Sequence, residues 1–372
     1  MKNKIGIITS YQSSKLLYFS MFILCALFTR DYYYVPTEST PLRTMSEIRS
    51  LTEENFSKNS LKEVIGYNVD DENNKYTLER RKAFRWLFLI TQGKIFKSII
   101  YISDNLFNKY FSDNAIIKTK FQAVIIWLYY GIFLFIIFHF MVKITSHFSL
   151  NDTIALYFCY FIFMLSLYFI LGRKEGGGYN YNVFETVFIT LGLYFSLTKK
   201  KIYYGMVCIF APLIRESGII ISIFYSLINS KSSIIKNKNT YIFPAISFLS
   251  MIIVNFDVIL DMLNPKFLGF FGTQGQYVTI FDLINGKISL SNIFNALIEI
   301  YYSYLIFIIF LTVFYTKSPV QKKIGIIISI YLIIFLLTTP IDQLGIRFLI
   351  IPLLTPYIYI GINESIAFKN QY

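Results

Sequence analysis

Histidine and cysteine are scarce in this chain, which limits the kinds of site it can build. Its 372 residues include two histidines and three cysteines. His139 and His147 are too far apart along the chain, with too few acids nearby, to predict a metal site. Cys25, Cys159 and Cys208 lie in apolar segments without C-x-x-C spacing, so neither a disulfide framework nor a zinc knuckle is indicated. The sequence indicates no metal centre and leaves a divalent-metal requirement open.

Charge is also scarce. Charged residues make up 15% of the chain and hydrophobic residues 55%, with a mean hydropathy of +0.52. Such a composition is too apolar for a soluble globule and predicts a polytopic protein with the lipid bilayer as its partner. The net charge of +13 comes largely from lysines beside apolar runs, where basic residues orient membrane helices. We therefore expect no nucleic-acid partner; the oligomeric state stays open.

The apolar runs predict the fold class. We expect an all-α polytopic membrane protein, residues 1–372 forming a single integral membrane domain with about eight spanning helices. The predicted spans lie near residues 15–29, 121–142, 152–171, 182–198, 241–259, 292–315, 323–339 and 346–363. Residues 1–30 have a basic start and a short apolar stretch but no clear small-x-small cleavage site, so we expect an uncleaved first helix.

The apolar run 202–229 is long for one span and short for two. If it crosses the membrane once, the basic residues of the short loops divide evenly between the two sides. If it forms a hairpin of two short helices, most of them lie inside, including the clusters at 231–238 and 317–323. The positive-inside rule therefore predicts a helical hairpin, with both chain termini in the cytoplasm. Arms of about 12 residues rise roughly 18 Å, about half of a ~30 Å hydrocarbon core.

Arg215 and Glu216 lie near the middle of that run, at the outward-facing tip of the expected hairpin. A charge in hydrocarbon costs at least a few kcal/mol, so two adjacent charges need a reason. Pro212 and Gly218 flank the pair, which is consistent with a break in the helix. Two interpretations stay open: a structural pair that fixes the hairpin, or groups that act on a substrate in an outward-facing cavity.

The same topology places the longest polar region outside. This first outer loop, residues 31–120, holds 12 of the chain's 22 acidic residues. Between residues 80 and 97, basic side chains lie among aromatic and aliphatic ones, which predicts interfacial helices that include Arg85. Those basic residues either anchor the segment to headgroups or bind a lipid phosphate. Asp31, immediately after the first helix, is either a solvated boundary charge or a functional carboxylate.

Two further outer segments carry polar candidates. Three consecutive glycines, 176–178, precede Tyr179 and Asn180, which supply hydrogen-bond donors and a stacking face. Asp342 and Arg347 lie at the mouth of the last helix, where Arg347 is either a snorkelling anchor or a ligand contact. We interpret Tyr179, Asn180, Asp342 and Arg347, together with Arg85 and Arg215, as candidate substrate-binding residues.

An outward cavity with these charges suits a substrate that has an anionic lipid end and a hydroxyl-rich head, as lipid-linked sugars do. Transfer of such a sugar needs a carboxylate that takes a proton from the acceptor hydroxyl and cations that stabilise the departing phosphate. A transporter or flippase of an anionic solute could use the same groups, although we find no inverted repeat. A membrane scaffold without catalysis is a third possibility.

Short motifs add a resemblance. The stretch from Tyr181-Asn182-Val183-Phe184 to Arg215-Glu216-Ser217-Gly218 resembles a pattern in bacterial multi-span proteins, namely an aromatic-polar pair, a helix, and a hairpin ending in Asn-Arg-Glu-Thr. Here Ile214 replaces the Asn and Ser217 the Thr. Arg85-Trp86-Leu87 is similar to their R-x-L segment, and Asp342 with Arg347-Phe348 is similar to their acid and R-F near the last helix. The overall layout resembles that of GT-C glycosyltransferases.

The resemblance implies a location and a chemistry. It implies a protein of the bacterial inner membrane that transfers glycosyl groups from or onto polyprenyl-(di)phosphate-linked sugars, with an O-antigen or exopolysaccharide polymerase as the close alternative. In that scheme Asp31 is the candidate base by position, and Arg85, Arg215 and Arg347 are candidate phosphate contacts. Glu216 is a second candidate catalytic residue, beside Arg215 at the hairpin tip.

The hairpin topology makes a labelling prediction. Single cysteines placed at Gly177 and Lys236, with the three native cysteines replaced, should react with a membrane-impermeant thiol reagent from opposite sides of the membrane. The hairpin places position 177 outside and position 236 inside. Labelling of both positions from one side would contradict it.

Overall fold

The computed structural model describes most of the helical part of the chain. The described residues are 14–27, 98, 101–102, 105–106, 115–149, 151–167, 180–214, 216–230, 237–262, 318–338 and 345–369. Throughout these ranges the regular secondary structure is helical and contains no β-strand. The predicted all-α class is therefore confirmed for the described residues. The first outer loop, 31–120, falls outside them except at the short stretches given above and at 115–120.

The helices follow the apolar runs of the sequence. In chain order they are Ser14–Leu27, α6 (Ala115–Ser146), α7 (Asp152–Ser166), α8 (Asn180–Leu197), α9 (Lys201–Ile214), the 3-10 helix η2 (Glu216–Ile223), α10 (Phe224–Asn229), α11 (Asn239–Met262), α16 (Pro319–Thr338) and α17 (Gly345–Lys369). Every predicted span except 292–315, which lies outside the described residues, coincides with a helix. One helix of the described residues, Leu128–Ser146 within α6, is long and apolar enough by length and composition to cross a membrane.

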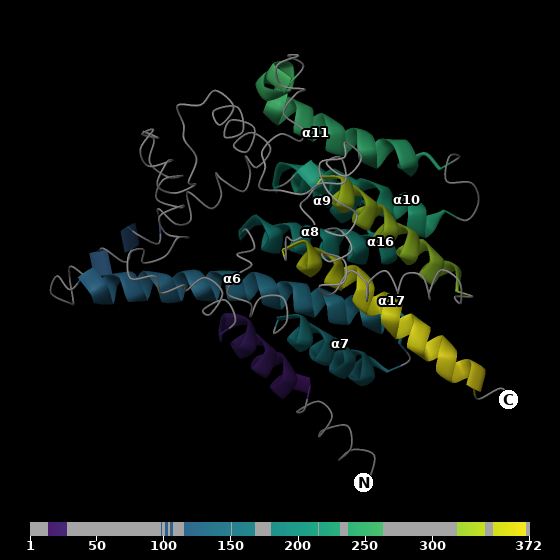
Figure 1. Ribbon diagram of the computed structural model, residues 1–372, viewed down its shortest axis with the longest axis horizontal. Coiled ribbons are helices and arrows are strands. Elements are labelled where there is room, and N and C mark those ends of the chain that lie inside the picture. Colours follow the sequence, from purple (N-terminus) through teal and green to yellow (C-terminus); the bar gives the residue numbers. More distant parts are fainter. Residues whose placement is uncertain are drawn as a thin grey trace, which may run out of the picture.

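α8 is the centre of the arrangement. It packs against α6, α9, α10, η2 and α17, and α11 packs on the far side of α9. In Figure 1 the long α6 runs across the molecule, with α7 and the N-terminal helix on one side and α8 to α11 on the other. An element that contacts so many neighbours has little surface left for solvent, which explains why most of α8 is buried.

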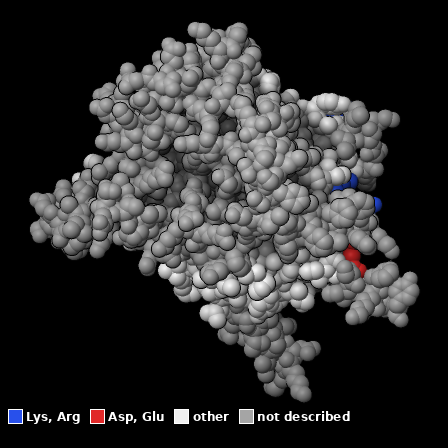
Figure 2. Space-filling model, in the orientation of Figure 1, with Lys and Arg blue, Asp and Glu red and all other residues white. Residues whose placement is uncertain are grey.

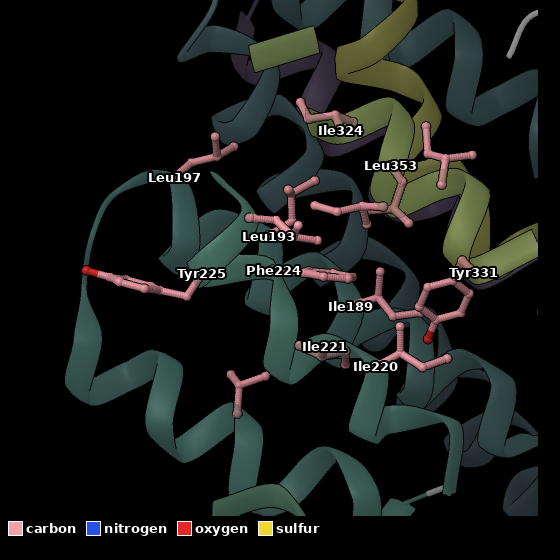
Figure 3. Close-up of a cluster of buried hydrophobic side chains, with 14 of the residues drawn as sticks. Ile189, Leu193, Leu197, Ile220, Ile221, Phe224, Tyr225, Ile324, Tyr331 and Leu353 are labelled. Atoms are coloured by element: carbon pink, nitrogen blue, oxygen red, sulfur yellow. The ribbon is translucent and has the colours of Figure 1, made fainter. Parts of the chain in front are cut away.

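Two hydrophobic clusters meet along α8. Val183 and Val187, in its first half, belong to a cluster with residues of α6, α7 and the N-terminal helix. Ile189, Leu193 and Leu197, in its second half, pack with η2, α10, α16 and α17. Figure 3 shows the second cluster, in which the rings of Phe224 and Tyr331 and the branched side chains of Ile189, Ile220 and Ile221 fill the interior.

The outer surface of α9 and α11 is apolar as well. Ile202 and Tyr203 on α9 are 80% and 56% exposed, and Leu249 and Ile253 on α11 are 55% and 75% exposed. Figure 2 shows one face of the molecule, on which few of the described residues are charged. Burial of an apolar side chain contributes roughly 1.5–3 kcal/mol, so a surface of this kind favours an apolar environment over water.

The chain reverses between Ile214, the end of α9, and Glu216, the start of η2, and η2 packs against α9. The Tyr204 hydroxyl donates to the carbonyl of Ile221 and accepts from the Tyr225 N–H at 3.0 Å. In a regular α-helix those two backbone groups would bond to each other, so the hydroxyl is inserted into the hydrogen-bond ladder. The returning arm is consequently a 3-10 helix followed by a short α-helix, and not the single α-helix that the sequence suggested.

Polar side chains close the other end of this hairpin. Asn229 Nδ2 donates to the carbonyls of Ser196 at 2.8 Å and Tyr225 at 3.1 Å. Lys323 Nζ, on α16, donates to the carbonyls of Ile228 at 3.1 Å and Ser230 at 2.8 Å. The last carbonyls of a helix have no partner within it and carry partial negative charge, so a lysine there is favourable. These bonds join the end of α10 to α8 and α16.

The turn between α8 and α9 is equally tight. Lys199 has a φ of 57°, in the left-handed region. The N–H groups of Lys199 and Lys200 donate to the carbonyls of Ser196 at 3.3 Å and Phe195 at 3.0 Å, which is the Schellman arrangement of a helix end. A non-glycine residue in this conformation costs roughly 1–2 kcal/mol. The left-handed conformation of Lys199 lets the chain reverse between α8 and α9.

Pro212 lies inside α9, two residues before its end. Because proline has no N–H, it cannot bond to the carbonyl four residues earlier, that of Cys208. The hydroxyl of Ser247 on α11, itself buried, donates to this carbonyl at 2.6 Å. A side chain from a neighbouring helix thus provides the hydrogen bond that the proline removes, as helices in apolar surroundings require.

Replacement of Ser247 by alanine should therefore leave the Cys208 carbonyl without its donor. We expect Ser247→Ala to lower the free energy of unfolding by about 1–2 kcal/mol, measured by thermal or denaturant unfolding of the purified protein. Ser250→Ala is the matched control on the same helix, because Ser250 bonds locally to the Ser247 carbonyl. Equal stability of the two variants would contradict this role of Ser247.

Candidate functional site

Three of the predicted site residues have a described backbone. Asn180 is the first residue of α8, Glu216 is the first residue of η2, and Arg347 lies in the first turn of α17. Their side chains lie outside the described part of the structure. The other predicted site residues, Asp31, Arg85, Tyr179, Arg215 and Asp342, lie outside it altogether.

The helix beginnings that carry these residues lie at one end of the bundle. Ile351, near the start of α17, belongs to the same buried cluster as Val183 and Val187, near the start of α8. A hydrogen bond from Ser217 to Glu185 joins the start of η2 to the start of α8. The backbone therefore places Asn180, Glu216 and Arg347 at the same end of the bundle.

Glu185 is the most unusual residue of this end. It lies in the second turn of α8, it is 1% exposed, and its Oε1 accepts a hydrogen bond from the Ser217 hydroxyl. A buried carboxylate is costly unless it is protonated or compensated by hydrogen bonds or charge. Ser217 belongs to the hairpin tip, two residues beyond Arg215, so the tip is tied to α8 through this acid.

Aromatic rings from α6 surround the start of α8. Phe184 packs on Phe133 with ring centroids 4.4 Å apart, and on Tyr130 at 6.0 Å. Tyr129 packs on Phe133 at 5.0 Å. Phe184 immediately precedes Glu185 on α8, so these rings make an apolar surrounding at this end, in which electrostatic interactions are stronger than in water.

Close backbone contact fixes the tip itself. A side-chain carbon at Gly218 would collide with the backbone of Ala211 and Pro212, on the opposite arm of the hairpin. Glycine therefore lets the two arms approach closely immediately after the turn. The contact holds Ser217, the neighbouring residue, within reach of Glu185.

Glu185 is not among the candidate site residues that the sequence predicted. The available signal was an acid within an otherwise apolar helix. What the sequence could not give was its orientation, because an acid in that position can face either lipid or the interior. The described residues contain no group of three or more His, Cys, Asp or Glu side chains that could hold a metal ion.

No family model, curated protein or solved structure matches this chain. The chemistry of the site therefore has to be argued from its own residues. A carboxylate that already accepts a hydrogen bond from a hydroxyl, in surroundings that exclude water, is suited to proton transfer from a hydroxyl. A hairpin tip with an arginine beside it adds a cation that cannot lose its proton.

The close contact at the tip can be tested by adding one methyl group. We expect Gly218→Ala to lower the free energy of unfolding by about 1–3 kcal/mol, because the added carbon meets rigid backbone. Gly205→Ala in α9 is the matched control: the added carbon would lie 3.8 Å from Phe243. There alanine should be neutral or stabilising, since it is the better helix former. A Gly218→Ala protein as stable as wild type would show that the arms are not in close contact.

Proposed function

We propose that this chain is a multi-pass protein of the bacterial inner membrane that transfers glycosyl groups from or onto polyprenyl-(di)phosphate-linked sugars at the outer face of the membrane. The process it serves is assembly of a surface polysaccharide. The observation that supports this proposal best is the buried Glu185, hydrogen-bonded to Ser217 beside the Arg215-Glu216 tip.

The membrane part of the proposal rests on the exposed apolar surface and on the hydrogen bonds that side chains make to backbone carbonyls inside the bundle. Large apolar side chains of α9 and α11 are exposed, which suits contact with acyl chains. Inside the bundle, Ser247, Tyr204 and Lys323 donate to backbone carbonyls. In hydrocarbon no water is present to take such roles, so protein side chains must do so.

The chemical part rests on the charges that the hairpin tip brings together with α8. A glycosyl phosphate donor carries negative charge that increases on the leaving oxygen in the transition state. Arg215 at the tip, with Arg85 and Arg347, would stabilise that charge in our proposal. Asp31, Glu216 or another acid at this end would take the acceptor proton. Tyr179 and Asn180, next to the start of α8, would contact the sugar.

Two alternatives share these features. A glycan polymerase would use the same charges on a longer acceptor, and a flippase of a lipid-linked sugar would use them to bind the phosphate without chemistry. The three differ in product: a transferase adds one sugar to every repeat unit, a polymerase lengthens chains, and a flippase delivers units to the outer face.

The proposal predicts a loss of surface glycan. In a deletion strain complemented at matched protein level, Arg215→Ala, Glu216→Gln and Asp31→Asn should each reduce the glycan or shorten its chains, visible as a changed ladder on a gel. Lys322→Gln, at an exposed lysine of α16, is the control and should restore the normal ladder.

The pattern of the ladder identifies the activity. Loss of one sugar from every unit supports a transferase, and single-unit product supports a polymerase. Complete units that remain on the cytoplasmic side indicate a flippase. Normal glycan in all three variants would overturn the enzymatic proposal.

A further inference from the structure

The Glu185 carboxylate holds a hydroxyl in the way that a general base holds its substrate. Its Oε1 accepts the Ser217 hydroxyl hydrogen, and the residue is 1% exposed. A general base must lie within hydrogen-bond distance of the proton it takes. The Ser217 hydroxyl is an alcohol that already donates to this carboxylate.

We propose that Glu185 is the residue that takes the proton from the acceptor hydroxyl, and that the Ser217 hydroxyl occupies the acceptor's position in the resting protein. This inference rests on the proposed glycosyl transfer, and it names a residue that the sequence did not select, in place of Asp31 or Glu216.

The step is a single displacement between two substrates. The acceptor hydroxyl oxygen forms a bond to the anomeric carbon of the sugar. The bond from that carbon to the phosphate oxygen breaks, and its electron pair stays on the departing polyprenyl (di)phosphate. The hydroxyl proton passes to Glu185. Before the next turnover Glu185 gives this proton to solvent or to the departing phosphate.

The surroundings of Glu185 favour this role. Thr186 and Thr190 follow it on α8, both buried, and the Thr190 hydroxyl is engaged with the Thr186 carbonyl at 2.6 Å. The Thr190 hydroxyl is turned to its own helix, whereas Ser217 comes from another element. A hydroxyl donated from a separate, displaceable element can exchange with that of a substrate, while one fixed to α8 cannot.

The element that carries Ser217 is the least regular of the described helices. η2 extends over 8 residues, from Glu216 to Ile223. Runs of 3-10 helix longer than three or four residues are uncommon, because their hydrogen-bond geometry is poorer, and they often mark a hinge. Rewinding 8 residues as α-helix would shorten the segment by about 4 Å, since the rise per residue falls from ~2.0 to ~1.5 Å. Such a change would withdraw Ser217 and admit the acceptor.

The test compares one substitution that removes the proton-accepting carboxylate with one that removes the hydroxyl. Glu185→Gln keeps the size of the side chain and an oxygen that accepts the Ser217 hydroxyl, but it cannot take a proton. Ser217→Ala keeps the carboxylate and removes the hydroxyl. We measure the initial rate at which surface glycan appears after induction of each variant in the deletion strain, at matched protein level.

We expect Glu185→Gln to lower this rate by about 100-fold or more, as removal of a general base does. Ser217→Ala should stay within about tenfold of wild type, since one hydrogen bond is lost. Glu185→Asp, which keeps the carboxylate but shortens it, should retain more activity than Glu185→Gln. The thermal unfolding midpoint of the Gln variant should equal that of wild type.

Other outcomes separate the two proposals. If deletion of the gene leaves the glycan unchanged, the proposed function fails. If deletion removes the glycan and Glu185→Gln restores it, the proposed function stands and the role of Glu185 is overturned. If Ser217→Ala lowers the rate as much as Glu185→Gln or more, the hydrogen bond between the tip and α8 is what the activity needs and Glu185 is not the base, which also overturns the inference.

Discussion

The bond pair made by the Tyr204 hydroxyl is the constraint on which the rest of the hairpin depends. It stands between the Ile221 carbonyl and the Tyr225 N–H, groups that a continuous α-helix would join directly. The insertion separates η2 from α10 and sets where the returning arm changes from 3-10 to α geometry. The Gly218 contact and the hydrogen bond from Ser217 to Glu185 lie on η2, the arm whose end this insertion marks.

The same physical requirement explains two other polar side chains. Each donates to carbonyls on another element that lack a partner within their own helix. Ser247 donates a hydrogen bond to the Cys208 carbonyl, which Pro212 leaves without its helical partner, and Lys323 donates to carbonyls at the end of α10. An unsatisfied buried polar group costs about 1–3 kcal/mol, so these bonds fix which helices are neighbours more sharply than apolar packing alone can.

The hairpin tip combines rigidity on one arm with irregularity on the other. Ala211 and Pro212 present rigid backbone to Gly218, while η2 holds its residues in a less favourable helix. A site that must admit a substrate and exclude water benefits from both properties. Glu185, on α8, bonds to Ser217 on the irregular arm, next to the glycine that meets the rigid arm.

Much of the architecture was readable from the sequence. Runs of apolar residues of helical length predicted every described helix of the bundle, and Pro212 with Gly218 marked the turn, because chain length, proline and glycine act locally. The switch to 3-10 geometry was missed, since it depends on Tyr204, 17 residues before Ile221. The partner of Glu185 was missed for the same reason, as Ser217 lies 32 residues further along the chain.

The sequence by itself determined the helical class, the helix boundaries to within about six residues and the place where the chain reverses. Only the tertiary structure decided which acid faces the interior and which hydroxyl it holds. The physical reason is that periodicity and turn residues specify a segment's own conformation, whereas the orientation of a lone polar side chain on an apolar helix is set by its neighbours. On α8, with few features to distinguish one face from another, those neighbours are α6, α17 and the hairpin.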